Sequence, residues 1–204
     1  MTPTAEQPVQ GEFCMRCGPD TGLHPYGDGS LLRCACCGWE RVVPRRPLFV
    51  VTGPSGVGRT TIMPALARSL TGCEVFDVDL TLHVAALGGD VWLNTWLQLA
   101  HGIALNGRST VLCGSLMPDY LEELPARRLV GPIHFCLLDA PDEVLVERLR
   151  ARPEWRGGDG EFVARRLKFA AWLRNHIQPS FSSFGCEPAI VADRVADWIT
   201  SSLD

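Results

Sequence analysis

The sequence predicts an α/β protein: a three-layer domain with a five-stranded parallel sheet, preceded by a small cysteine-rich unit. From residue 47 onward, short apolar runs rich in β-branched residues alternate with helical patterns, which is typical of a parallel sheet. Before residue 47, two closely spaced cysteine pairs stand in a stretch too short to build its own hydrophobic core. We therefore expect two domains of unequal size.

The composition is that of an ordinary globular chain. Its 204 residues carry a formal net charge of −4, and 46% of them are hydrophobic. No apolar run approaches the ~18 residues of a membrane-spanning helix, and the acidic balance argues against a broad nucleic-acid footprint. The first residues lack the basic start and apolar core of a secretory signal, so we expect a short disordered lead over residues 1–11 and a cytoplasmic protein.

Four cysteines form two C-x-x-C pairs, each followed by glycine. They are Cys14, Cys17, Cys34 and Cys37. This spacing is typical of a zinc ribbon, in which four thiolates bind the metal tetrahedrally and the metal supplies folding free energy that a domain over residues 12–46 lacks. His24 and Cys36 are alternative ligands, but only Cys37 reproduces the spacing of the first pair. Disulfides are the other alternative, which a reducing cytoplasm disfavours.

The cysteine spacing predicts the metal of the ribbon but leaves two alternatives for its function. Four of its arginines could contact nucleic acid or a phosphorylated ligand, namely Arg33, Arg41, Arg45 and Arg46. We favour a structural or protein-docking role instead. The segment Pro44–Pro47 is the predicted domain boundary, because proline restricts itself and the residue before it to extended conformations. The cysteines without paired spacing, expected to be buried small hydrophobes, are Cys73, Cys113, Cys136 and Cys186.

A phosphate-binding loop is predicted at the start of the second domain, residues 47–204. An apolar strand from Leu48 leads into a glycine-rich turn and a helix from about Thr60 to Leu70. The backbone N–H groups of such a turn, together with the helix dipole, form an anion site. The predicted nucleotide-binding residues are Gly53, Pro54, Ser55, Gly56, Val57, Gly58, Arg59, Thr60 and Thr61. The Thr60 hydroxyl is also the predicted magnesium ligand.

Arg59 stands where the usual loop sequence has a lysine. Arginine keeps the positive charge, but its planar fork on a longer stem is not interchangeable with a compact ammonium group. The chain contains 18 arginines and a single lysine, Lys168, so the replacement agrees with a general preference for arginine. We expect polyphosphate binding, whereas the rate of turnover stays open.

A second strand, from Cys73 to Asp79, is predicted to end in two carboxylates at the sheet edge where ligands bind in open α/β folds. Alternation along an extended segment places Asp77 and Asp79 on the same side. One would contact Mg²⁺ or its waters, and the other would orient or deprotonate an acceptor hydroxyl. A solvated turn or a helix cap is the alternative. A third strand ends at Gly114-Ser115 without an acid, so metal support would come from Thr60 and Asp77.

The remaining pattern completes the sheet. Asp90 is expected to cap a helix from about Val91 to Leu105. Its apolar stripe, expected to be core, is Trp92, Trp96, Leu99 and Ile103. His83 and His101 are expected to be structural. The later elements are a fourth strand over 131–139, a short fifth strand over Pro188–Val191 and a terminal helix from about Ala192.

An arginine-rich lid is predicted near residues 148–166. Arg148 and Arg152 are four residues apart and would share a helix face, Arg156 stands in a glycine-rich loop, and the next helix, from near Glu161, carries Arg165 and Arg166. Arginines in a lid can neutralise charge on a phosphoryl group during transfer. A solvated basic face is the alternative.

The order of phosphate loop, D-x-D strand, Gly-Ser strand end and arginine lid resembles the small P-loop kinases. This group includes shikimate, gluconate and nucleoside monophosphate kinases and chloramphenicol phosphotransferase. The resemblance covers residues 47–204, and Phe76-Asp77-Val78-Asp79 is similar to the F-x-D-x-D of shikimate-kinase-like enzymes. It implies that Asp77 lies near Mg²⁺, that Asp79 activates the acceptor hydroxyl, and that Arg148 or Arg152 is the lid arginine. Arg59 and the zinc ribbon depart from the common plan of these kinases.

We predict an ATP- and Mg²⁺-dependent phosphotransferase acting on a hydroxyl or phosphate of a small metabolite. Its predicted catalytic residues are Arg59, Asp79, Arg148 and Arg152. The alternative is a nucleotide-binding switch or adaptor with weak or no turnover, whose ribbon binds a protein or nucleic acid. A GTPase is disfavoured because the sequence has no N-K-x-D guanine-reading motif. The sequence does not identify the acceptor, the preference for ATP or GTP, or the oligomeric state.

Overall fold

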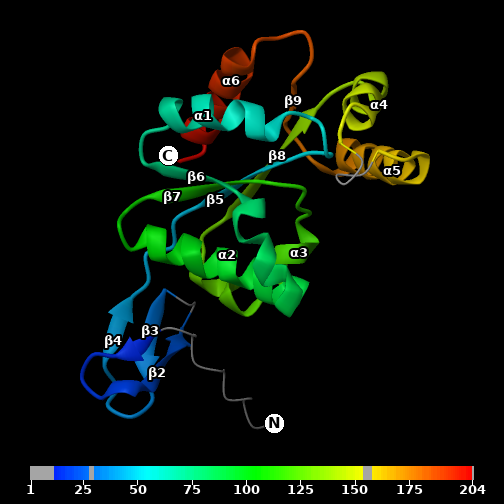
Figure 1. The fold of residues 1–204 in the computed structure, drawn as a ribbon. Coiled ribbons are helices and arrows are strands. Elements are labelled where there is room, and N and C mark those ends of the chain that lie inside the picture. Colours follow the sequence, from blue (N-terminus) through cyan, green and yellow to red (C-terminus); the bar gives the residue numbers. More distant parts are fainter. Residues whose placement is uncertain (1–11, 28–29, 154–157, 204) are drawn as a thin grey trace.

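The computed structural model describes residues 12–27, 30–153 and 158–203. Figure 1 shows a small antiparallel sheet at the N-terminal end and, beyond it, a larger sheet with helices on both faces. The predicted disordered lead, residues 1–11, and the predicted lid residue Arg156 lie outside the described residues.

The small sheet is the ribbon. Its strands β1 (Phe13–Cys14), β2 (Gly18–Tyr26), β3 (Leu31–Cys34) and β4 (Glu40–Val42) pair antiparallel in sequence order. Cys14 ends β1 and Cys34 ends β3, and the second cysteine of each pair stands in the turn that follows. The two C-x-x-C turns therefore lie at the same end of the sheet.

The large sheet is five-stranded and parallel, as the sequence predicts. Its strands are β5 (Leu48–Thr52), β6 (Cys73–Asp77), β7 (Ser109–Cys113), β8 (Ile133–Asp139) and β9 (Ser180–Ser182). Their spatial order is β6-β7-β5-β8-β9. The strand that enters the phosphate loop is thus the central one, with β7 on one side and β8 on the other.

Helices cover both faces of this sheet (Figure 1). On one face lie α1 (Arg59–Ser69) and α6 (Pro188–Ser201). The other face carries η1 (Val78–Leu87), α2 (Gly89–Ala104), α3 (Asp119–Glu122) and η2 (Pro125–Leu129). Beside the β8 end stand α4 (Asp142–Arg150) and α5 (Gly160–His176). No helix in the described part of the chain has both the length and the apolar composition needed to cross a membrane.

Alternation along β5 explains why this strand is central. All five of its residues are buried. Phe49 and Val51 belong to the hydrophobic cluster that includes α1 and α6, whereas Leu48 and Val50 belong to the cluster that includes α2. A strand that is apolar on both faces can be covered only between two helical layers.

The fifth strand is not where the sequence predicted it. Residues Pro188–Val191 form the first turn of α6, which therefore begins before Ala192. Proline is favoured at the first position of a helix, and the buried residues of α6 recur at helical spacing. The true fifth strand, β9, has only three residues and no apolar run to reveal it.

Helix α2 also differs in detail from the prediction. Its N-cap is Gly88, and Asp90 stands inside the first turn rather than capping it. Leu99, predicted to be core, is 43% exposed. The buried face consists of Leu93, Trp96, Leu97, Ala100, His101 and Ala104. The prediction holds for Trp96, which is buried, and for Trp92, which packs against the core, but not for Leu99.

The ribbon shares its core with the α/β domain. Leu23 and Leu32 of the ribbon lie in one hydrophobic cluster with Leu48 of β5 and Leu97 of α2. Across the same junction, the Glu12 carboxylate accepts hydrogen bonds from Arg41 at 2.8 Å and pairs with His101 Nε2 at 3.2 Å. The junction therefore combines apolar packing with a buried polar cluster.

The burial of His101 predicts a pH-dependent stability. The side chain is almost fully buried, and burial lowers its pKa below the usual 6.5, although Glu12 acts in the opposite direction. The unfolded chain then binds a proton that the folded chain does not, so the free energy of unfolding should fall as pH drops through about 6.5. His101→Gln, which cannot titrate, should flatten the pH profile of urea unfolding between about pH 7.5 and 5.5. His83→Gln, at an exposed histidine, should not, and equal slopes for wild type and His101→Gln would contradict the assignment.

Candidate functional site

The phosphate loop joins β5 to α1, and its glycines meet two separate requirements. Gly56 and Gly58 have φ angles of 88° and 105°, in the left-handed region that favours glycine. Gly53 is required by close packing, because a Cβ there would lie 2.5 Å from the Leu138 carbonyl oxygen of β8. The loop conformation therefore depends on its local sequence and on the neighbouring strand.

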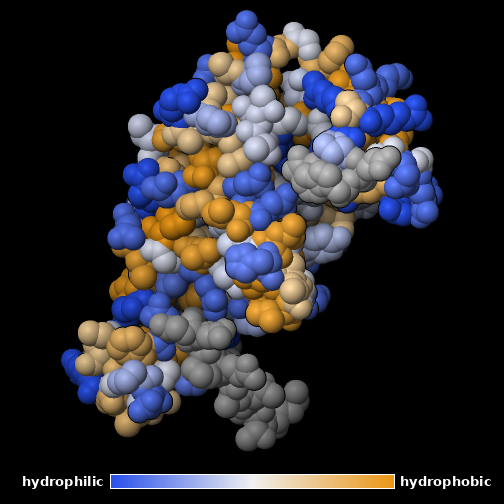
Figure 2. Space-filling model, in the orientation of Figure 1, coloured by the Kyte–Doolittle hydropathy of each residue, from blue (hydrophilic) through white to orange (hydrophobic). Residues whose placement is uncertain are grey.

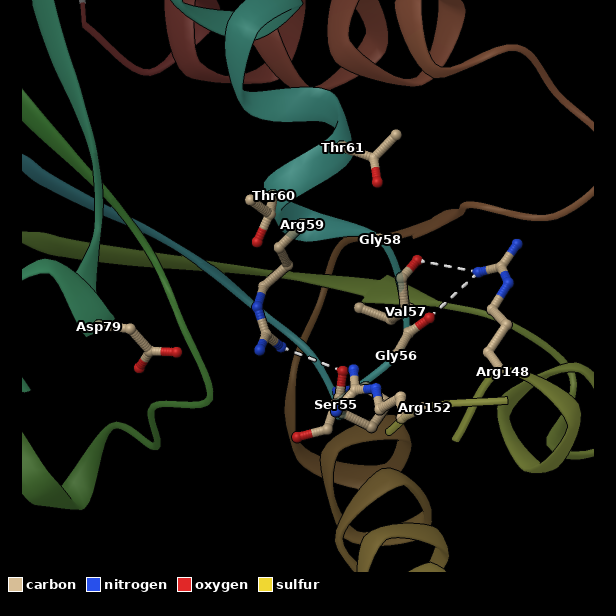
Figure 3. Close-up of a pocket in the computed structure, with 11 residues that line it drawn as sticks. Ser55, Gly56, Val57, Gly58, Arg59, Thr60, Thr61, Asp79, Arg148 and Arg152 are labelled. Carbon is tan, nitrogen blue, oxygen red and sulfur yellow. Dashed lines mark hydrogen bonds between the residues drawn. The ribbon is translucent and has the colours of Figure 1, made fainter. Parts of the chain in front are cut away.

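The loop forms the floor of a pocket of about 340 Å³ (Figure 3). Residues 54–61 line it together with Asp79, Arg148 and Arg152. Because α1 begins at Arg59, its N-terminus and the positive end of its dipole lie at this pocket. These features make the pocket suited to an anion such as a polyphosphate.

Arg59 is bound to acceptors of its own loop. Its Nη1 donates to the carbonyl oxygens of Gly53 and, at 3.2 Å, Pro54, while Nη2 donates to Ser115 Oγ at 3.0 Å. Ser115 Oγ in turn donates to the Gly53 carbonyl at 3.0 Å. Burial lowers the pKa of the Arg59 guanidinium, and nearby Cys113, Asp77 and Asp79 act against that effect. Arg59 thus braces the loop while adding positive charge beside the pocket.

Asp77 and Asp79 do not lie on one extended segment as predicted, because β6 ends at Asp77 and Asp79 belongs to η1. Asp77 is the N-cap of η1: its Oδ1 accepts from the Asp79 N–H at 3.0 Å. Its Oδ2 accepts from the Thr60 hydroxyl at 3.2 Å. Asp79 instead lines the pocket, opposite Arg148 in Figure 3. The two carboxylates therefore have different environments.

The predicted lid arginines are also separated. Helix α4 ends at Arg150, so Arg152 stands beyond it and does not share a helical face with Arg148. Arg148 Nη1 donates to the carbonyl oxygens of Gly56 and Val57, each at 3.3 Å (Figure 3). Arg152 lines the pocket. On α5, Arg165 pairs with Glu161 at 2.5 Å, which fits the alternative of a solvated basic face.

A second pocket of about 300 Å³ lies against the other side of the loop. It shares Gly56, Val57, Gly58, Thr61 and Arg148 with the first pocket. Its remaining walls are Ile62 of α1, Ser183 and Cys186 from the segment between β9 and α6, and Pro188 and Val191 of α6. The sequence pattern did not reveal this wall, because it predicted a strand over Pro188–Val191 and a buried Cys186, whereas Cys186 is only partly buried. Ser115 was noted only as a strand end, not as a partner of Arg59.

The four predicted zinc ligands converge in the ribbon. The sulfur atoms of Cys14, Cys17, Cys34 and Cys37 all lie within 4.8 Å of one another. Cys14 Sγ is 3.6 Å from Cys37 Sγ, and Cys34 Sγ is 3.9 Å from Cys17 Sγ. A tetrahedral site with Zn–S bonds of ~2.3 Å requires sulfurs about 3.8 Å apart, so the cluster could hold zinc. Neither Cys36 nor His24 belongs to it, and all nine cysteines are free thiols.

Solved structures with this fold include several kinases. An unliganded sugar kinase from a Janibacter species is 23% identical with a TM-score of 0.55, over 77% of this chain and 95% of its own. The tunicamycin resistance protein of Deinococcus radiodurans is 21% identical with a TM-score of 0.55, over 76% of this chain and 96% of its own. Shikimate kinase from Bacteroides thetaiotaomicron is 19% identical with a TM-score of 0.50, over 76% and 98%.

The chain has the fold of the small P-loop kinases. No protein-family model matches the sequence. No curated protein matches it either. At these identities the likeness is one of fold, so the chemistry has to be argued from the site of this chain.

The cysteine cluster predicts one zinc ion per chain. Cys14→Ser should weaken zinc binding by at least about 100-fold, because loss of a ligand costs no less than loss of a supporting contact. It should also lower the melting temperature of the whole chain, since Cys14 belongs to the core shared with the α/β domain. Zinc content after a chelator challenge measures the first effect. Cys36→Ser is the matched control and should retain zinc, whereas equal loss in both variants would contradict the ligand set.

The Arg59–Ser115 contact predicts a stabilising role for the Ser115 hydroxyl. Ser115→Ala removes one hydrogen bond from Arg59 and one to Gly53, so the free energy of unfolding should fall by about 2 kcal/mol. Nucleotide affinity should fall as well, because the loop is then less preorganised. Urea unfolding and calorimetric titration with Mg·ATP measure the two effects. Ser55→Ala tests a hydroxyl on the pocket side of the same loop, and a stable Ser115→Ala protein would remove Ser115 from this role.

Proposed function

We propose that the protein is an ATP- and Mg²⁺-dependent phosphotransferase that acts on a hydroxyl or phosphate of a small metabolite. One observation carries the proposal: a carboxylate, Asp79, faces a helix N-terminus and a glycine-rich loop across one pocket. Polyphosphate at the loop and an acceptor at Asp79 would share this cavity. Phosphoryl transfer needs such an arrangement more than it needs covalent chemistry, because positioning and charge stabilisation supply most of the catalysis.

The residues support separate parts of the reaction. Loop amides at Gly56 and from Gly58 to Thr60 would bind the phosphates, and Arg59 and Arg152 would add positive charge where negative charge builds up. Asp79 would orient the acceptor hydroxyl and receive its proton. The second pocket, walled by residues from Ser183 to the first turn of α6, adjoins the loop and has room for a nucleoside.

Thr60 and Asp77 are suited to hold magnesium, because hydroxyl and carboxylate oxygens are its preferred protein ligands. Their oxygens are 3.2 Å apart at the start of α1. Magnesium held by these two residues would supply positive charge that offsets negative charge on the phosphates. Zinc in the ribbon would have a structural role, and in this reading the ribbon supports the enzyme rather than binding nucleic acid.

A nucleotide-binding switch or adaptor is the second candidate. The observation that favours it is the Arg59 guanidinium, which directs three hydrogen bonds to Gly53, Pro54 and Ser115 of its own chain. Such a protein would bind nucleotide, transfer phosphate slowly or not at all, and capture a partner only in the nucleotide-bound state.

The role of Asp79 can be tested by substitution. Asp79→Asn should lower kcat about 10²- to 10⁴-fold, because the acceptor loses its proton-accepting group, while Mg·ATP affinity is retained. Release of ADP measures transfer, and calorimetric titration measures binding. Asp90→Asn is the control, since this carboxylate is exposed on the neighbouring helix. Unchanged transfer in Asp79→Asn would remove Asp79 from the mechanism, and nucleotide binding without any transfer by the wild type would favour the switch.

A further inference from the structure

An exposed apolar surface begins directly after Asp79. Leu80, Leu82 and Leu87 of η1 are 67%, 51% and 75% exposed, and Val91 in the first turn of α2 is 47% exposed. We call these four residues the apolar wall. Figure 2 shows hydrophobic residues gathered over this part of the α2 face. Four large apolar side chains left in water within twelve residues mark a surface that binds something, whereas single exposed leucines are ordinary.

The wall is held in place by its own hydrogen bonds. Trp96 Nε1 donates to the Val78 carbonyl oxygen at 3.2 Å, and Trp92 Nε1 donates to Thr81 Oγ1 at 3.0 Å. Asp77 caps the start of the same segment through the Asp79 N–H. These contacts fix η1 against α2 and keep Asp79 next to the wall. The exposure of the leucines is therefore a property of a fixed segment that also carries the pocket carboxylate.

The charges of this segment disfavour an anionic ligand bound against the wall. Residues 78–104, which form η1 and α2, contain no lysine and no arginine, and Asp79 and Asp90 are acidic. A carboxylate or phosphate bound against the wall would lose its hydration without gaining a cation. The arginines of the pocket, Arg59, Arg148 and Arg152, lie on the side of the phosphate loop. The cations of the site thus come from α1, from α4 and from the residues that follow α4, and none comes from η1 or α2.

From these observations we infer that the phosphoryl acceptor is an uncharged compound with a largely apolar body and a free hydroxyl, bound against the apolar wall. This inference rests on the proposed phosphotransferase function and specifies its substrate class. The acceptor oxygen would attack the γ-phosphorus of ATP, the bond from that phosphorus to the β,γ-bridging oxygen would break, and ADP would leave. The hydroxyl proton would pass to the Asp79 carboxylate, so the products are a phosphate ester and ADP.

A homologous series of straight-chain alcohols tests the wall directly. Binding of n-butanol, n-hexanol and n-octanol to the full-length, zinc-loaded protein would be measured calorimetrically. Affinity should rise about fourfold with each added methylene, as expected when a chain leaves water for an apolar surface. Octanoate, with the same chain length and a carboxylate, should bind severalfold more weakly than octanol. A flat series, or octanoate binding as tightly as octanol, would overturn the inference.

Matched variants locate the binding. In the double variant Leu80→Asn/Leu82→Asn, the affinity for alcohols should rise less than about twofold with each added methylene. The control Leu105→Asn changes a leucine of similar exposure, 46%, at the far end of α2 and should keep the wild-type gradient. If affinity rises equally with chain length in the wild type, the double variant and the control, the alcohols bind somewhere other than the apolar wall, which would overturn the inference. A wild-type dimer that the double variant converts to monomer would assign the wall to a second copy of the chain and overturn the inference.

Failure of the inference is distinguishable from failure of the proposed function. Titration of the same samples with Mg·ATP measures nucleotide binding by the loop alone. The rate of ADP release with octanol, compared with the rate with glycerol, measures phosphoryl transfer to an apolar acceptor. One outcome is that the protein binds nucleotide and phosphorylates polar alcohols, but its affinity for alcohols does not rise with chain length. That outcome would support the phosphotransferase function and contradict the apolar acceptor. Absence of nucleotide binding would remove the phosphotransferase, and with it the assignment of any acceptor, whatever the alcohols do.

Discussion

The turn from β5 into α1 constrains the rest of the site. Its backbone must pass so close to the Leu138 carbonyl of β8 that only glycine fits at position 53. It must also reverse direction through Gly56 and Gly58, which adopt left-handed conformations, before the helix begins. A turn with this geometry leaves backbone N–H groups facing one cavity, and β5 places it at the centre of the sheet. The other site residues reach this cavity from the ends of β6 and β7 and from α4.

Arg59 changes how this loop is supported. With its donors on Gly53, Pro54 and Ser115, the guanidinium makes the loop part of a polar network with the end of β7. A serine suits this network, because its hydroxyl accepts from Arg59 and donates to Gly53, which an ionised carboxylate could not do. The absence of an acid at the end of β7 and the presence of arginine in the loop are therefore structurally consistent with each other.

The ribbon and the α/β domain form one packed unit at their junction. Cys14 and Cys34 lie in the same hydrophobic cluster as Trp96 of α2, and Trp96 binds the backbone immediately before Asp79. The cysteine cluster, the apolar wall and the pocket carboxylate are thus connected through α2. This arrangement gives the ribbon a structural reason to be present that requires neither nucleic acid nor a protein partner.

The sequence by itself determined the parts of this protein that depend on local spacing. Alternating patterns predicted the α/β class and four of the five strands, the glycines predicted the loop, and two C-x-x-C pairs predicted four sulfurs that converge. Tertiary structure decided the rest. Asp79 is not part of the strand, because the strand ends at Asp77, which caps η1. Arg148 donates hydrogen bonds to Gly56 and Val57, which lie about ninety residues earlier in the chain. Ser115 meets Gly53 across 62 residues, and β9 forms beside β8 without an apolar run of its own. Periodicity and turn chemistry act over a few residues, whereas hydrogen-bond partners distant in the chain are selected only when the sheet brings strand ends together.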